Sequence, residues 1–246
     1  MNSRAKLTTG YVEVFRRDLS VSWEYVSLPN RVATSVRGEV EELSLKSRAR
    51  LAWVANNTSV EFAAMITLTY PAIFPKDGKV VKSHLKRFLQ RLKRRCGSVS
   101  YLWFIEFQRR GAPHFHVLVT KEGGAVGRGW LSKAWFEVVG SRDEKHILAG
   151  TRVEFLRSKD GAARYVSKYA YKTWQKSVPE DYRNVGRFWG HSVDVKPKPK
   201  GKFDVTCDGE IESLLRHVGV DDVDVERKYR VYFGVAQDVA ELLCAG

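Results

Sequence analysis

Residues 103–120 of this 246-residue chain read Trp103-Phe104-Ile105-Glu106-Phe107-Gln108-Arg109-Arg110-Gly111-Ala112-Pro113-His114-Phe115-His116-Val117-Leu118-Val119-Thr120. Two apolar-rich runs flank a turn signal around Gly111 and Pro113, so we predict a β-hairpin. Side chains alternate between the two faces of a strand, which places His114 and His116 on one face. Antiparallel pairing across the turn can bring Glu106 onto that face, within reach of both imidazoles.

Glu106, His114 and His116 are therefore candidate ligands of a metal site with open coordination positions. Two imidazoles and one carboxylate suit Mn²⁺, Mg²⁺ or Zn²⁺, and they leave room for a water molecule or a phosphate oxygen. On spacing alone, a His-x-His pair on a half-buried strand is more often hydrogen-bonded polar surface than a metal site. The spacing alone leaves both interpretations open.

A second motif lies in residues 164–172, which read Arg-Tyr-Val-Ser-Lys-Tyr-Ala-Tyr-Lys. At helical spacing, Tyr165 and Tyr169 are neighbours on one face, and Lys168 and Lys172 form a second pair beside them. A free tyrosine has a pKa of about 10 and needs a nearby cation to act as a nucleophile at neutral pH. These lysines and a metal could supply it, whereas Tyr171 faces elsewhere and is expected to pack.

The ordered set of motifs resembles the HUH endonucleases, the rolling-circle replication initiators of single-stranded DNA phages and plasmids. Residues 111–116 resemble their His-hydrophobic-His motif, residues 66–70 resemble their first strand, and residues 165–169 resemble the two-tyrosine motif of the phage-type initiators. A Gly-Arg-x-Trp-Gly stretch similar to residues 186–190 also follows the tyrosine helix in phage-type relatives. The motifs agree in order and in spacing.

The resemblance implies a fold as well as an activity. Composition and spacing support only a mixed fold, for which we predict the α+β class. The family adds a central five-stranded antiparallel sheet that carries the hairpin in its middle, with residues 60–70 as the central strand and with helices packed on the far face alone.

The activity implied by the resemblance is metal-dependent nicking of single-stranded origin DNA. A tyrosine attacks the scissile phosphate, which leaves a 5'-phosphotyrosine linkage and a free 3' hydroxyl, and the strand is later rejoined. In similar initiators one tyrosine opens the circle and its neighbour closes the cycle; Tyr165 matches the first and Tyr169 the second. No phosphate-binding loop is present, so a host helicase and a host polymerase are the expected partners.

Charge and cysteine content point to a polyanionic partner and a reducing compartment. The net charge is +14 and the sequence pI is about 9.7, which favours nucleic acid over a membrane as the partner. Three distant cysteines form no paired spacing. The sequence contains no signal peptide and no apolar run of membrane-spanning length, so we expect a soluble protein of the bacterial host cytoplasm.

The charge reverses near the C-terminus. Residues 203–246 contain 4 Lys or Arg and 10 Asp or Glu. Residues 1–202 therefore contain 38 Lys or Arg and 18 Asp or Glu, which is a net charge of +20. We therefore expect a basic DNA-binding endonuclease domain over residues 1–202 and an acidic extension over residues 203–246, packed on the same domain or facing a host protein. This extension is expected to hold a helix over 211–218 and a strand over 225–235.

An amphipathic helix is predicted over residues 83–95, with an unusually basic outer face. Further helices are expected at 40–54, 130–139 and from 160 to about 175, strands at 11–16, 19–26 and 151–157, and a flexible connector at 123–129. Basic and aromatic side chains can grip phosphates and stack on bases. The candidate DNA-binding residues are Lys86, Arg87, Arg91, Arg94, Arg187 and Trp189.

Three other classes of protein fit some of these features. Non-haem iron oxygenases also use two histidines and a carboxylate, but they require neither the basic body nor the tyrosine pair. An HUH transposase or a plasmid relaxase would use similar motifs for a different task. A DNA-binding repressor with a structural metal site would bind DNA without cutting it.

Overall fold

The computed structural model describes residues 9–14, 19–24, 42–158, 161–170, 178–205, 213, 216–217 and 229–232. The chain divides into two compact units. The central unit comprises Arg37–Ala55 and Val60–Lys196, and the terminal unit comprises Met1–Val36, Asn56–Ser59 and Pro197–Gly246. The predicted hairpin and the tyrosine motif both lie in the central unit.

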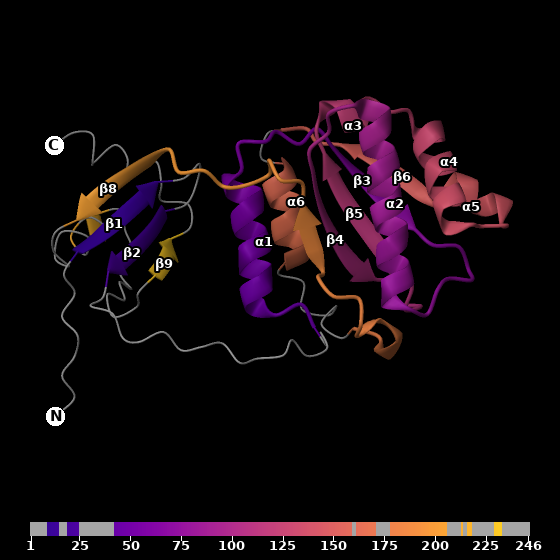
Figure 1. Ribbon diagram of the computed structural model, residues 1–246, viewed down its shortest axis with the longest axis horizontal. Helices are drawn as coiled ribbons and strands as arrows, with labels where there is room; N and C mark the ends of the chain where they lie inside the picture. Colours follow the sequence, from indigo (N-terminus) through magenta and orange to yellow (C-terminus); the bar gives the residue numbers. More distant parts are fainter. Residues whose placement is uncertain are drawn as a thin grey trace. The chain divides into compact units, whose positions relative to one another are not determined.

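The sheet of the central unit is antiparallel and has the strand order β6-β3-β5-β4-β7 (Figure 1). The predicted hairpin is confirmed, because β4 and β5 pair directly. The middle strand is β5, so the expectation that residues 60–70 form the central strand is wrong: β3 lies between β5 and β6. The strands are β3 (Ala64–Thr69), β4 (Tyr101–Phe107), β5 (Pro113–Val119), β6 (Thr151–Phe155) and β7 (Trp189–His191).

Helices cover both faces of this sheet, with α2 on one side and α1 and α6 on the other (Figure 1). Among the described residues, no helix is long and apolar enough to cross a membrane. The helices are α1 (Leu45–Asn57), α2 (Gly78–Cys96), α3 (Lys121–Ala125), α4 (Arg128–Val139), α5 (Glu144–Ala149) and α6 (Gly161–Ala170), with a 3₁₀ turn at Glu180–Tyr182.

The two layers of helices follow from the composition of β4. Consecutive residues of β4 from Leu102 to Ile105 are all buried, so both faces of the strand are apolar and both must be covered. Trp103 packs with Phe88 of α2 on one face, while Phe104 packs with Val166 of α6 on the other. The α+β class with a central antiparallel sheet is confirmed, but the helices lie on both faces rather than on one.

Helix α2 begins at Gly78, five residues before the predicted start at Ser83. The side chain of Asp77 accepts a hydrogen bond from the Lys79 backbone N–H at 2.7 Å, which caps the first turn. The helix ends at Cys96, and Gly97 follows with a positive φ of 72°. The predicted basic helix is confirmed, with a start that the sequence placed too late.

Helix α3 occupies residues for which the sequence predicts a flexible connector. Gly123 and Gly124 are buried within it. A Cβ atom at Gly123 would lie 2.8 Å from side-chain carbons of Val119 and Val99, so the glycine permits close helix–strand packing. The connector prediction is wrong for residues 123–125, because these glycines serve packing rather than flexibility.

The terminal unit contains a second antiparallel sheet, with the order β8-β1-β2-β9. Strand β8 crosses the domain boundary expected at residue 202, and its pairing with β1 joins the two ends of the sequence in one unit. The predicted helix over 211–218 lies largely outside the described residues. The strands are β1 (Thr9–Val14), β2 (Leu19–Glu24), β8 (Gly201–Val205) and β9 (Tyr229–Tyr232), near the strands predicted at 11–16, 19–26 and 225–235.

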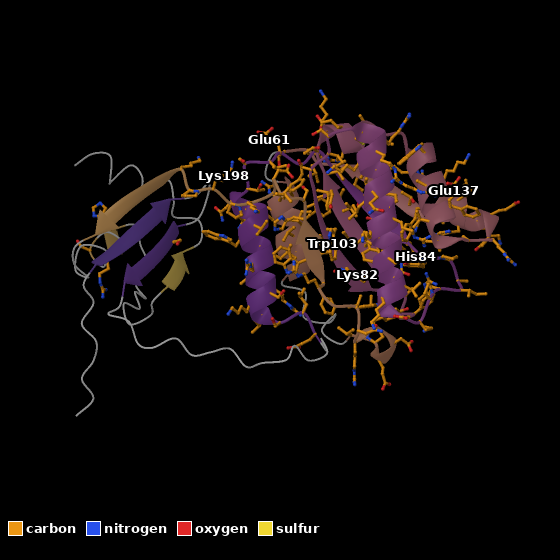
Figure 2. All side chains as sticks on the ribbon, in the orientation of Figure 1. Glu61, Lys82, His84, Trp103, Glu137 and Lys198 are labelled. Carbon is orange, nitrogen blue, oxygen red and sulfur yellow. The ribbon has the colours of Figure 1, made fainter. Side chains whose placement is uncertain are left out.

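Buried His84 on α2 should make the protein sensitive to mild acid (Figure 2). Its Nδ1 lies 3.0 Å from the Tyr70 hydroxyl, and burial, followed by the charge of Arg87, lowers the His84 pKa to about 4. The unfolded chain takes up this proton near its ordinary pKa of about 6.5, so the unfolded state binds more protons between these two pH values. The free energy of unfolding should therefore fall by up to about 3 kcal/mol as the pH drops from 6.5 to 4.

Urea unfolding of the wild type and of His84→Gln at several pH values would measure this effect. A glutamine can still accept from Tyr70 but does not titrate, so the variant should lose less stability in this window. The exposed His217 provides the matched control, as His217→Gln. Identical pH slopes for the wild type and His84→Gln would contradict the prediction.

Candidate functional site

The turn between β4 and β5 is held by backbone and side-chain hydrogen bonds. Gly111 takes a φ of 78°, which a residue with a Cβ atom rarely adopts, and its N–H donates to the Gln108 carbonyl at 2.7 Å. The guanidinium of Arg110 donates to the carbonyls of Tyr70 and Pro71, at 2.7 Å each, and to Gln108 Oε1 at 2.9 Å. These bonds tie the turn to the segment that follows β3.

Glu106 and His116 meet on one face of the hairpin. His116 Nε2 lies 3.0 Å from Glu106 Oε2, and the two side chains are only 5% and 12% exposed. His116 Nδ1 lies 3.4 Å from the Thr67 hydroxyl of β3. Because a hydroxyl can donate or accept, Thr67 is compatible with either neutral tautomer of His116.

His114 joins the same face, as the alternation of β5 predicts. It is the cross-strand partner of Glu106, and its ring stacks on that of His116 with centroids 4.7 Å apart and an interplanar angle of 14°. The side chain of Gln108 places its Nε2 atom 3.2 Å from His114 Nδ1. The predicted convergence of Glu106, His114 and His116 on one face is thus observed, and Gln108 contacts one of the three.

His116 and Glu106 are joined at a hydrogen-bond distance, which is also a separation that two ligands of one ion can have. Neighbouring ligands of an octahedral ion such as Mg²⁺ lie about 2.1 Å from the ion at right angles, and so about 3 Å from each other, which is close to the 3.0 Å between His116 Nε2 and Glu106 Oε2. Within the described part of the chain, no three His, Cys, Asp or Glu side chains are already grouped to hold an ion. The donor types fit a divalent ion, provided that His114 reorients toward the other two.

Helix α6 lies on the sheet face that carries this site. Tyr165 is partly buried and packs against the cluster that contains Phe104 and Leu118, whose side chains share the face of His116. Tyr169 follows one turn later in the same helix, and Lys168 is exposed. Lys172 lies outside the described residues. The catalytic roles of all four stay predictions.

Comparison with known proteins matches this same segment. The model of a family of replication-associated proteins, described by the name ORF2, matches residues 63–174. Over these residues the chain resembles replication proteins. The matched segment contains the hairpin with Glu106, His114 and His116, as well as helix α6 with Tyr165.

Two similar proteins come from Xylella fastidiosa, and each carries the name "Putative replication protein". The protein of strain 9a5c is 31% identical over 116 residues, which are 43% of this chain and 39% of that protein. The protein of strain Temecula1 is 29% identical over 145 residues, which are 56% of this chain and 52% of that protein. This chain therefore spans about half or less of the relatives that it matches. No solved structure matches it.

The candidate DNA-binding residues have different surroundings in the structure. Lys86, Arg94 and Arg187 are exposed. Arg87 donates to the Val138 carbonyl at 2.8 Å, and Arg91 forms an ion pair with Glu137 at 2.6 Å. The contacts of these two arginines join α2 to α4, which leaves Lys86, Arg94 and Arg187 as the better placed candidates for phosphate contact.

Trp189 has a structural partner as well. Its Nε1–H donates to the Ser47 hydroxyl of α1 at 2.9 Å, and its ring packs against the core between α1, α6 and the sheet. This position agrees with packing at the sheet edge, the alternative to base stacking. Its contact with DNA stays a prediction.

Sequence reasoning missed two residues that shape this unit. Arg110 reads as one of two arginines in a turn, and only the fold brings the carbonyls of Tyr70 and Pro71 to its guanidinium. Lys82 reads as an ordinary helical lysine, yet its Nζ lies 3.6 Å from the ring centroid of Trp103. Neither contact leaves a local signal, because both join segments that are distant in sequence.

Proposed function

We propose that this chain is a rolling-circle replication initiator of the HUH type, which nicks and rejoins one strand of origin DNA. The observation that carries the proposal is the contact of Glu106 with His116 beside His114, on the sheet face against which Tyr165 packs. The similarity of residues 63–174 to replication proteins supports the same role.

Glu106, His114 and His116 are the residues that would hold a divalent ion, with Mn²⁺ or Mg²⁺ favoured and Zn²⁺ as the alternative. When bound, such an ion supplies Lewis-acid stabilisation of the negative charge that develops on a scissile phosphate. Thr67 would keep His116 oriented by accepting from its Nδ1–H, which leaves the Nε2 lone pair directed at the site. Gln108 would restrain the His114 ring as a donor instead, because its Nε2–H group points at His114 Nδ1, which accepts.

A tyrosine of α6 would carry the covalent step. The Tyr165 or Tyr169 oxygen forms a bond to phosphorus while the bond from phosphorus to the 3' oxygen breaks. The tyrosine proton is released, and the departing 3' oxygen takes up a proton to become a hydroxyl. Lys168 and Lys172 would favour the ionised tyrosine. The phosphotyrosine bond conserves the energy of the phosphodiester, so rejoining by the reverse reaction needs no ATP.

The similarity favours replication over the related tasks. The family description and both relatives name replication proteins. A transposase or a plasmid relaxase could use the same kind of site, but neither is named by these matches. The single-stranded origin of its own replicon is the proposed substrate, and a host helicase and polymerase are the proposed partners.

Loss of the histidine pair should abolish formation of the covalent adduct. The wild type and His114→Ala/His116→Ala would be incubated with single-stranded origin DNA and Mn²⁺, and adducts scored on a denaturing gel. Because several kcal/mol of transition-state stabilisation depend on the ion, the adduct should fall on the order of 10³-fold in the variant, and equally in the wild type with chelator. His217→Ala, at an exposed position, is the matched control.

A second measurement separates metal binding from catalysis. Mn²⁺ should raise the melting temperature of the wild type but not of the histidine variant, because a ligand stabilises only the state that binds it. Tight DNA binding with no adduct under any metal would exclude the nicking proposal and favour a repressor. An adduct that survives both chelation and the double substitution would exclude the metal mechanism.

A further inference from the structure

A groove of about 350 Å³ lies between α2 and β4, outside the site already described. Its wall on β4 is formed by Tyr101 and Trp103, and α2 contributes Lys82, Lys86 and Lys93 together with two leucines and a glutamine. Side chains alternate along β4, and Trp103 belongs to the core beneath α2, whereas Phe104 belongs to the opposite core. The groove therefore opens on the sheet face opposite to the histidine pair.

Lys82 lines this groove and lies beside Trp103 (Figure 2). Its ammonium lies 3.6 Å from the centroid of the Trp103 ring and donates to the Arg187 carbonyl at 2.8 Å. Burial, followed by the charge of Arg187, lowers the Lys82 pKa to about 7. An anion entering the groove would stabilise the charged form of Lys82 and would be attracted in return.

The aromatic wall is fixed in place. A Cβ atom at Gly190 of β7 would lie 2.9 Å from Cζ2 of Trp103, so the glycine allows the indole to pack flat against the neighbouring strand. Tyr101 is partly buried beside it, and burial, followed by the charge of Asp194, raises the Tyr101 pKa, which keeps the phenol neutral. Trp103 is only 9% exposed and its ring is covered by Lys82, so it supports the wall, while the partly exposed Tyr101 is the ring on which a base can stack.

The charge of the groove selects the class of ligand. Its lining contains three lysines and no acidic residue, and a second groove that shares Lys93 and also includes Arg94 continues along α2. Lysines arranged beside aromatic rings suit a ligand that offers both phosphates and exposed bases. Single-stranded DNA offers both, whereas a duplex hides the faces of its bases in the stack.

We propose that the groove between α2 and β4 binds a segment of single-stranded DNA, with Lys86 and Lys93 at its phosphates and Tyr101 beside a base. The chain would thus hold DNA on the sheet face opposite to the proposed nicking site. This inference does not depend on nicking, since it concerns binding alone and can be tested in the presence of a chelator.

The first test is equilibrium binding of a fluorescent 12-residue oligothymidine to the full chain in chelator, over a range of salt concentrations. For Lys86→Ala/Lys93→Ala the dissociation constant should rise about tenfold. The slope of log affinity against log salt should become shallower by about 1.4, since each phosphate contact on a single strand contributes about 0.7. Lys133→Ala/Lys145→Ala removes the same charge from exposed positions on α4 and α5 and should change neither quantity.

The second test addresses the aromatic wall. Tyr101→Ala should weaken binding about tenfold through loss of stacking, while Tyr101→Phe should bind as the wild type does. An oligonucleotide containing 5-iodouracil should crosslink to a peptide of β4 when irradiated. Melting temperatures close to that of the wild type would show that the variants are folded.

Several outcomes would overturn the proposal. An equal loss in the α4 and α5 control would mean that only total charge matters. Duplex DNA binding as tightly as the single strand would exclude base contact, and displacement by an equal concentration of polyglutamate would point to an acidic peptide instead. Crosslinks confined to the β4–β5 turn or to α6 would move the binding site to the other face.

Discussion

Replacement of both motif tyrosines, as Tyr165→Phe/Tyr169→Phe, is expected to abolish the covalent protein–DNA adduct. Removal of both candidate attacking oxygens takes the proposed nucleophiles out of the site, so adduct formation should fall on the order of 10³-fold or more. Tyr165 packs through its ring against the core between α6 and the sheet, and phenylalanine preserves that ring. The loss should therefore be chemical, with little change in melting temperature.

The single variants distinguish the roles of the two residues. Tyr165→Phe should reduce the first cleavage more than Tyr169→Phe does. Tyr171 lies outside the described residues; helical spacing predicts that it faces away from the other two, so Tyr171→Phe should retain cleavage. Denaturing gels with labelled origin DNA would measure all four proteins. Abolition of nicking by Tyr171→Phe alone, with Tyr165→Phe and Tyr169→Phe both active, would refute the assignment.

Truncation of Trp135 to alanine is expected to destabilise the central unit severely. The side chain is fully buried and meets Tyr70, Phe88 and Phe115 edge-on. The cavity left behind should reduce the free energy of unfolding by about 3–5 kcal/mol. For a unit of this size, the melting temperature should fall by about 10 °C or more.

Trp135 also supports the end of β3 next to the candidate site. Its Nε1–H donates to the Thr69 carbonyl at 2.8 Å, His146 Nε2 lies 2.7 Å from the same oxygen, and Thr69 pairs with His114. Trp135→Phe should therefore cost less than Trp135→Ala, while Ile73→Ala, at a side chain that is 90% exposed, should change stability by less than about 0.5 kcal/mol. Calorimetry would decide; a loss below about 1 kcal/mol for Trp135→Ala would contradict the packing argument.

The hairpin of β4 and β5 is a part of the fold that the local sequence pattern could predict. Alternation along β5 and the turn around Gly111 were enough to predict that Glu106, His114 and His116 share a face, and the register of β4 and β5 confirms it. The prediction of a flexible connector failed at α3, because glycine in a sequence indicates more than one kind of structure. Glycines at 123 and 124 read as flexible, because sequence does not tell a glycine that bends the chain from one that permits close packing.

The order of the strands in the sheet could not be predicted from the local sequence pattern either. The run from 60 to 70 is as apolar as β5, and only long-range pairing places β5 in the middle of the sheet. Likewise, the sequence treats the basic candidates of α2 alike, but the fold ties Arg87 and Arg91 to α4 and leaves Lys86 beside an aromatic wall.

The sequence by itself determined the α+β class, the hairpin, the basic helix and the shared face of the histidines, because strand alternation and helical periodicity are local properties. Only the tertiary structure decided that Thr67 contacts His116, that Arg110 fastens the turn, and that Lys82 lies on Trp103. Each of these contacts joins segments far apart in the chain, so its position depends on how the sheet and helices pack rather than on any neighbouring residue.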